Sequence, residues 1–126
     1  MMKIIGLGSA IVECLRIAQM IERHGETFLH QVYTLDEIEY CSLRSLAATH
    51  YARFWVGKKA VLQALGGTWS GGPDWRDIEI RPTRPQLQVR LRGVAEQLRV
   101  RRGAAEVMLS LAHCRSHASA YAIATG

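Results

Sequence analysis

The chain has 126 residues, of which 48% are hydrophobic and 21% charged, with a formal net charge of +5. This composition excludes a disordered protein, and the length suits a single domain covering residues 1–126. Charged residues and glycines interrupt the apolar stretches well short of the ~20 residues that span a bilayer, so we expect no membrane contact. The positive charge indicates an anionic partner. Basic and aromatic residues do not interleave as in proteins that stack single-stranded bases, which disfavours nucleic acid.

The N-terminal part predicts a strand followed by a helix. The start, MMKIIGLGSA, is too short and too interrupted by glycine for a signal peptide, and it predicts a strand at residues 3–8. Residues 11–23 place apolar side chains at helical spacing, with Arg16 and Arg23 on the polar side. This pattern predicts an amphipathic helix with a basic stripe, and we expect His24-Gly25 to end it.

Two further helices are predicted next. Thr34, with Glu37 three residues later, forms a capping box that opens a short helix at residues 35–41. Residues 43–65 contain many good helix formers and end at Gly66-Gly67, a fitting C-terminal cap. They predict a long central helix, followed by a loop in the run GGTWSGGP.

The C-terminal half predicts most of the strands. Residues 77–80 and 87–91 alternate as two strands, and residues 92–102 are helical. A closing antiparallel hairpin is expected from residues 106–112 and 118–124. The order β-α-α-α-β-β-α-β-β is that of an α+β fold.

The cysteines indicate the redox compartment. Cys14, Cys41 and Cys114 are an odd number at wide spacings, with no CxxC pair. Such thiols are typical of reduced, cytoplasmic proteins, so we expect a cytoplasmic location.

Four segments, in chain order, match the motifs of one known family. GLGSAIVECLRI resembles G-[IL]-G-x-D-[IL]-V-E-x-x-R-[IF], and RHGETFLHQVYTLDEIEYC resembles the next stretch with its T-x-x-E. HYARFWVGKKAVLQALGGTWSGG resembles R-F-A-A-K-E-A-x-x-K-A-L-G-T-G, and EVMLSLAHCRSHASAYAIA resembles S-[IL]-[ST]-H-x-x-x-[HY]-A-x-A. The similarity covers nearly all of the chain. By these motifs the chain resembles the holo-acyl-carrier-protein synthases of the 4′-phosphopantetheinyl transferase superfamily.

The resemblance implies a fold and a reaction. It implies an antiparallel sheet wrapped around a long central helix, and a homotrimer with active sites between subunits. It implies transfer of phosphopantetheine from coenzyme A to a serine of an acyl carrier protein, a step of fatty acid biosynthesis. In the family a divalent ion, usually magnesium, bridges the diphosphate of coenzyme A and two protein carboxylates, and so neutralises charge at the reacting phosphoryl group. Basic residues on the first helix dock the acidic carrier protein.

The chain departs from these motifs where metal ligands are expected. Ala10 stands at the position of the aspartate and Lys59 at that of the glutamate, and neither side chain ligates magnesium. Gln63 replaces the lysine one turn further on, Phe54 replaces the arginine, and Ala112 replaces the polar residue before the last histidine. We therefore expect no metal ligands at these positions.

The resemblance also nominates individual residues. The candidate catalytic residues are Glu13, Lys58 and His113. The candidate contacts of coenzyme A are Lys58, Lys59, Gln63, Gly66, Gly67 and His113, the two glycines through backbone N–H groups. Arg16 and Arg23 are the candidates for docking the carrier protein. Ordinary surface or packing roles stay open for all of them, as they do for His50.

Several alternatives stay open at this point. A zinc site formed by His113, Cys114 and His117 is a weak pattern without a partner cluster. Trp69 and Trp75 pack either near an adenine or in a subunit interface. Three functions remain: a protein that binds coenzyme A or a carrier protein with little or no transfer, an active phosphopantetheinyl transferase, and a different activity on the same fold.

Overall fold

The computed structural model describes residues 3–70 and 72–126, and its elements follow the predicted order. Residue 71 of the predicted loop lies outside the described residues. The elements are β1 (Ile4–Glu13), α1 (Cys14–Val32), α2 (Leu35–Ser42), α3 (Ala47–Ala64), β2 (Ile78–Arg81), β3 (Gln88–Leu91), α4 (Gly93–Arg102), β4 (Glu106–His113) and β5 (His117–Thr125). A short 3-10 helix, Trp75–Asp77, precedes β2. Within these ranges no helix is long and apolar enough to cross a membrane.

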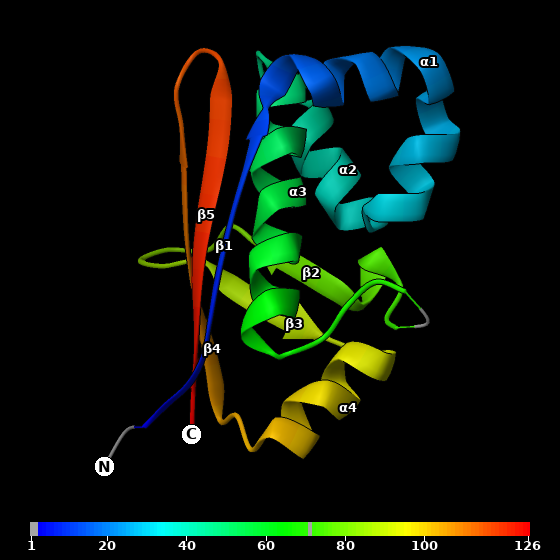
Figure 1. Ribbon diagram of the computed structural model, residues 1–126. Helices are drawn as coiled ribbons and strands as arrows, with labels where there is room; N and C mark the ends of the chain where they lie inside the picture. Colours follow the sequence, from blue (N-terminus) through cyan, green and yellow to red (C-terminus); the bar gives the residue numbers. More distant parts are fainter. Residues whose placement is uncertain (1–2, 71) are drawn as a thin grey trace.

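Helix α3 is the element on which the others pack. The strands form a three-stranded antiparallel sheet in the order β1-β5-β4 and a two-stranded sheet of β2 and β3. Helix α3 contacts β1, β5, β4 and β2, while α1 and α4 lie at opposite ends of the molecule (Figure 1). The prediction of an α+β fold with antiparallel strands around a central helix is confirmed.

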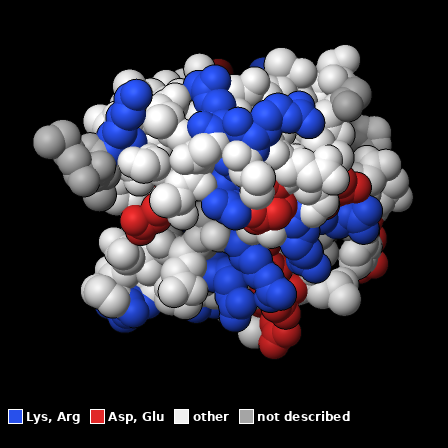
Figure 2. Space-filling model, turned by 90° about the horizontal axis from the view of Figure 1, so that it is seen from below, with Lys and Arg blue, Asp and Glu red and all other residues white. Residues whose placement is uncertain are grey.

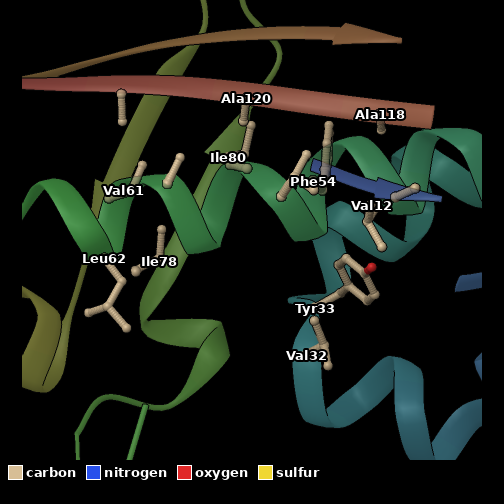
Figure 3. Packing of buried hydrophobic residues seen from close by; sticks show 14 of the residues in the cluster. Val12, Val32, Tyr33, Phe54, Val61, Leu62, Ile78, Ile80, Ala118 and Ala120 are labelled. Carbon is tan, nitrogen blue, oxygen red and sulfur yellow. The ribbon is translucent and has the colours of Figure 1, made fainter. Parts of the chain in front are cut away.

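The core surrounds α3 on two sides. Figure 3 shows Val61 directed toward β5 and Leu62 directed to the other side of the helix, where Ile78 of β2 lies. Val61 and Ile78 are fully buried. Because α3 is enclosed on both sides, few of its side chains reach the surface.

The contact between α3 and β1 is made by backbone on backbone. A Cβ atom built on Gly6 would lie 1.8 Å from the carbonyl oxygen of Ala64, and one on Gly8 would lie 1.9 Å from that of Ala60. Only glycine fits at such distances. On the neighbouring strand, β5 presents a row of buried alanines to the helix: Ala118, Ala120, Ala122 and Ala124. This small-residue seam sets which residues of α3 lie beside which residues of β1.

Three parts of the chain differ from the prediction by more than one residue. Residues 11–13 continue β1 instead of opening the helix, because they pair with residues 117–119 of the closing hairpin. Gly25, with φ 52 and ψ −132, breaks the helical geometry as expected, but helix α1 resumes and ends at Val32. Helix α3 begins only after Leu46, whose φ of 60 is left-handed.

We expect Gly8→Ala to lower the free energy of unfolding by about 1–3 kcal/mol or to prevent folding, because the added methyl group would overlap a helix carbonyl. Urea denaturation measures this change. Ser9→Ala, at an exposed neighbouring position of the same strand, is the control and should change stability by less than about 0.5 kcal/mol. Equal stability of the two variants would contradict the close packing at Gly8.

Candidate functional site

Two polar side chains interrupt the buried half of α3. Between residues 56 and 65 only Lys59 and Gln63 are exposed. They are one helical turn apart, so they lie on the same face of the helix. Gln63 Oε1 accepts a hydrogen bond of 2.8 Å from the backbone N–H of Ser9 in β1. The exposed stripe of α3 therefore runs along β1, the edge strand of the sheet.

Lys59 lies between two shallow hollows beside Ala10. Ser9 lines one hollow and Ile11 lines the other, and Lys59 borders both. The first hollow, of about 360 Å³, is also lined by Leu62, Gln63, Gly67, Thr68 and Trp69. The second, of about 340 Å³, is also lined by Val12, Glu13, Arg16, Trp55 and His117. The structure thus brings the predicted residues Glu13, Lys59 and Gln63 to one region of the surface.

The donor atoms of this region do not fit magnesium. Magnesium is bound by hard oxygen ligands, whereas Ala10 offers a methyl group and Lys59 an ammonium group. Glu13 is the one carboxylate that lines the hollow it shares with Lys59. Across residues 3–70 and 72–126, His, Cys, Asp and Glu side chains form no group of three that suits a metal ion, and this also counts against the zinc alternative.

The ammonium group of Lys59 contacts an aromatic ring and forms no ion pair with the described residues. Its Nζ atom lies 4.6 Å from the centre of the Trp55 ring, a cation–π contact. The Trp55 ring stacks on Trp75 at 5.5 Å, and Trp75 stacks on Trp69 at 3.8 Å. None of the ion pairs formed by the described residues involves Lys59. Its charge therefore remains available to an anion from outside.

Lys58 occupies a very different place from its neighbour. Its side chain is fully buried, and Nζ lies 2.8 Å from Glu37 Oε1. The same ammonium donates hydrogen bonds to the carbonyl oxygens of Trp75 and Ile78. Burial lowers the pKa of Lys58, and the charge of Glu37 opposes this effect. We therefore assign Lys58 a structural role, and not the catalytic and phosphate-binding role expected from the resemblance.

Glu37 holds α2, β2 and α3 together through the same buried carboxylate. Its Oε1 accepts from the backbone N–H of Thr34 at 2.9 Å, which completes the predicted capping box, and its Oε2 accepts from Ile80 N–H at 2.9 Å. Burial and then the charge of Glu37 raise the pKa of Cys41 to about 12, so this thiol is protonated. Sequence reasoning found the capping box but missed the buried pair with Lys58, because no local spacing links residues in different elements.

Gly66 and Gly67 are the C-terminal cap of α3. Gly66 has a φ of 76, its N–H donates to Gln63 O at 3.0 Å, and Gly67 N–H donates to Leu62 O at 3.0 Å. This pair of hydrogen bonds is the Schellman motif. The cap prediction is confirmed. Since both N–H groups are used inside the helix end, they do not cradle phosphate, and that expectation is corrected.

His113 lies in a second cationic group, at the N-terminal end of α3. The ring centroids of His113 and His50 are 6.2 Å apart, and Arg53 Nη1 lies 3.3 Å from His50 Nδ1. Arg53 Nε is buried and has no hydrogen-bond partner among the described residues. Burial lowers the pKa of His50, and the charges of Arg53, His113 and Arg44 lower it further. We call Arg44, His50, Arg53 and His113 the histidine–arginine cluster.

The histidine–arginine cluster and Lys59 lie apart within one chain. His113 belongs to β4 and Lys59 lies beside β1, and these strands are the two edges of the three-stranded sheet. Along α3, His50 and Lys59 are nine residues or about 13 Å apart. The resemblance nominated His113 and Lys59 as contacts of the same ligand, coenzyme A. Within a single copy of the chain, however, these two side chains do not lie side by side. Sequence reasoning read His50 as a surface or packing residue, although its helical spacing from Arg53 was a signal.

The predicted docking arginines lie on α1. Arg16 lines the hollow that contains Lys59, whereas Arg23 is exposed further along the helix, just before Gly25. Positive charge is not confined to this helix. Figure 2 shows Lys and Arg side chains spread over the opposite end of the molecule, where α4 exposes Arg101 and Arg102.

The two adjacent lysines provide a matched test of these assignments. We expect Lys58→Met to lower the free energy of unfolding by about 3–5 kcal/mol, because it leaves the buried Glu37 carboxylate without its partner. Lys59→Met should change it by less than about 0.5 kcal/mol, since this side chain is exposed. Urea denaturation of both variants measures the difference, and similar losses would refute the assignment.

Comparison with known proteins identifies the family. Residues 6–125 match the family described as the 4′-phosphopantetheinyl transferase superfamily. A holo-[acyl-carrier-protein] synthase of Rhodopirellula baltica is 42% identical over 124 residues, which are 97% of this chain and 98% of that protein.

Solved structures share the fold over its whole length. Plasmodium yoelii acyl carrier protein synthase with ADP bound gives a TM-score of 0.88 at 25% identity and covers 100% of this chain and 98% of its own. The Chronobacterium ammoniagenes ACPS-CoA complex gives a TM-score of 0.77 at 26% identity, over 98% of this chain and 96% of its own. The chain therefore belongs to the holo-acyl-carrier-protein synthase family of the 4′-phosphopantetheinyl transferase superfamily.

Proposed function

We propose that this protein binds coenzyme A and an acyl carrier protein, and that magnesium-dependent transfer of phosphopantetheine by it is impaired. The names of the relatives and the coenzyme A complex of a structural neighbour support the binding half of the proposal. One observation supports the proposed loss of magnesium-dependent transfer. The region beside β1 presents the methyl group of Ala10 and the ammonium group of Lys59 where the family motifs have carboxylates.

The cationic groups suit the phosphates of coenzyme A. Coenzyme A carries a diphosphate and a separate 3′-phosphate, and both are anionic at neutral pH. Lys59 offers one ammonium group, and the histidine–arginine cluster offers two guanidinium groups and two imidazoles. None of these groups forms an ion pair with another described residue. Because these groups lie at opposite edges of one sheet, we propose that one coenzyme A molecule contacts them on two different copies of the chain.

The outer face of the three-stranded sheet supports a homotrimer. This face, turned away from α3, exposes Leu7, Ile11 and Tyr121 to 64%, 68% and 64%. Large apolar side chains exposed together on one face are commonly covered in assemblies, and identical copies are the commonest partners. We propose that further copies of this chain cover it and thereby bring β1 of one copy close to β4 of another.

The carrier protein is proposed to dock along α1. Arg16 and Arg23 are exposed cations on this helix, and acidic helices of a carrier protein would complement them. Arg16 also lines the hollow beside Lys59, so a carrier protein held there would present its serine close to a bound diphosphate. A cytoplasmic location and fatty acid biosynthesis remain predictions for this protein.

An active transferase is the second candidate. The 42% identity to a named synthase over nearly the full length of both chains favours it. Such activity would require metal ligands at other positions, because Ala10 and Lys59 supply none. Glu13 is the carboxylate that lines the hollow beside Lys59, and substrate oxygens and water would complete the set of ligands.

The transfer reaction distinguishes the two candidates. The protein is incubated with apo carrier protein, coenzyme A and magnesium, and mass spectrometry follows the mass of the attached arm. Because misalignment of the attacking and leaving oxygens can cost about 100-fold in rate, we expect the native protein to be slower than the Ala10→Asp, Lys59→Glu double variant by about that factor.

The same experiment contains its controls. Arg101→Glu, on the exposed surface of α4 and outside both hollows, should leave the rate of the native protein unchanged. Rapid magnesium-dependent transfer by the native protein at catalytic amounts would establish the second candidate instead. Failure of the double variant to gain activity would show that further positions limit the transfer.

Coenzyme A affinity should depend on pH through His50. Its pKa is lowered from the usual value of 6.5, so the ring is mostly neutral at pH 7, and a nearby phosphate raises the pKa again. Binding then takes up a proton. The affinity should rise, by at most about tenfold per pH unit, as the pH falls toward the pKa of His50 in the free protein, which lies below 6.5, and it should level off below that pKa.

The controls for this dependence are two histidine variants. Titration calorimetry of His50→Gln should give a smaller change with pH, because this variant has no imidazole at position 50 to take up a proton. His24→Gln, on the exposed surface of α1, should behave as the native protein does. Equal pH dependence of the native protein and His50→Gln would exclude His50 from the site.

A further inference from the structure

We propose that Lys59 takes the place of a divalent metal ion, so that this protein holds the diphosphate of coenzyme A without any metal. This inference rests on the proposed binding of coenzyme A. It goes beyond that proposal because it assigns the cation to the chain itself.

The position of Lys59 is the first support. The ammonium group belongs to a helix that is buried on both sides, and it emerges beside Ala10 between the two hollows. The seam at Gly8 keeps α3 at this height along β1. A positive charge is thus placed on the scaffold at the site where the family motifs supply two ligands for a cation.

The charge balance is the second support. Relative to the motif, alanine at position 10 removes one negative charge, and lysine at position 59 replaces a negative with a positive charge. Glutamine at position 63 removes one positive charge. The three differences together add two positive units, which equals the charge of one divalent ion. The Coulomb attraction for a diphosphate is thereby retained, although its source is now covalently part of the chain.

The surroundings of Lys59 are the third support. No carboxylate of the described residues forms an ion pair with it, in contrast to Lys58, whose charge Glu37 compensates. The Trp55 ring beneath the ammonium is itself stacked on Trp75, so this face of Lys59 rests on a packed surface. An ammonium placed in this way has N–H donors to offer to phosphate oxygens.

The same substitution explains why binding and transfer separate. Magnesium supplies charge and also an octahedral arrangement that aligns the attacking and leaving oxygens. An ammonium group supplies the charge and donors but imposes no such arrangement. A site of this composition retains the diphosphate and loses the alignment that transfer needs.

Titration calorimetry with chelator tests the inference. We expect coenzyme A to bind the native protein with affinities that agree within about twofold in EDTA and in magnesium. Lys59→Gln should bind about tenfold or more weakly in both, because one charge-assisted contact is lost. Arg101→Glu changes another exposed cation, on α4, and is the control expected to match the native protein.

Two smaller ligands locate the contact. Dephospho-coenzyme A retains the diphosphate and lacks the 3′-phosphate, so Lys59→Gln should weaken its binding as strongly as that of coenzyme A. Adenosine 3′-phosphate lacks the diphosphate, so its binding should be unaffected by Lys59→Gln. Equal losses for both ligands would overturn the inference.

The remaining outcomes separate this inference from the proposed function. Coenzyme A binding that requires magnesium would overturn the inference and leave the proposed function in place. No binding of coenzyme A under either condition would overturn the proposed function, and the inference with it. Undiminished binding by Lys59→Gln would likewise overturn the inference, since the exposed side chain is not needed for folding.

Discussion

The close approach of α3 to β1 is the constraint on which the rest of the structure depends. Gly6 and Gly8 leave room for the carbonyl oxygens of Ala64 and Ala60, and no residue with a side chain fits there. Since this contact is backbone on backbone, it sets both the distance between helix and strand and their relative height. The exposed stripe that carries Lys59 is consequently held along the edge strand, where its charge faces solvent beside Ala10.

Two adjacent lysines illustrate how one helix serves structure and function at once. Successive residues of an α-helix point in directions about 100° apart, so Lys58 enters the core while Lys59 leaves it. The buried ammonium is satisfied by Glu37 and two carbonyl oxygens, and removal of either charge would leave the other uncompensated. The exposed one has no such partner within the described residues, which is the condition for binding a ligand anion.

The cationic groups of the chain are divided between the two edges of one sheet. Lys59 lies at the β1 edge, and the histidine–arginine cluster lies at the β4 edge with an unsatisfied Arg53 Nε. In the proposed function, a ligand with two separated anionic groups connects these edges across an interface between copies. The apolar outer face of the same sheet provides a reason for copies to associate. Assembly and ligand binding are thus coupled in the proposed function.

The amino-acid sequence by itself determined the element order, the capping box at Thr34, the cap at Gly66 and the family, because each depends on residues close together in the chain. Tertiary structure decided the rest. It extended β1 to Glu13 through pairing with the closing hairpin, and it buried Lys58, which the sequence had assigned to phosphate. Pairing and burial depend on partners far away in the chain, so neither the spacing of residues nor their type reveals them.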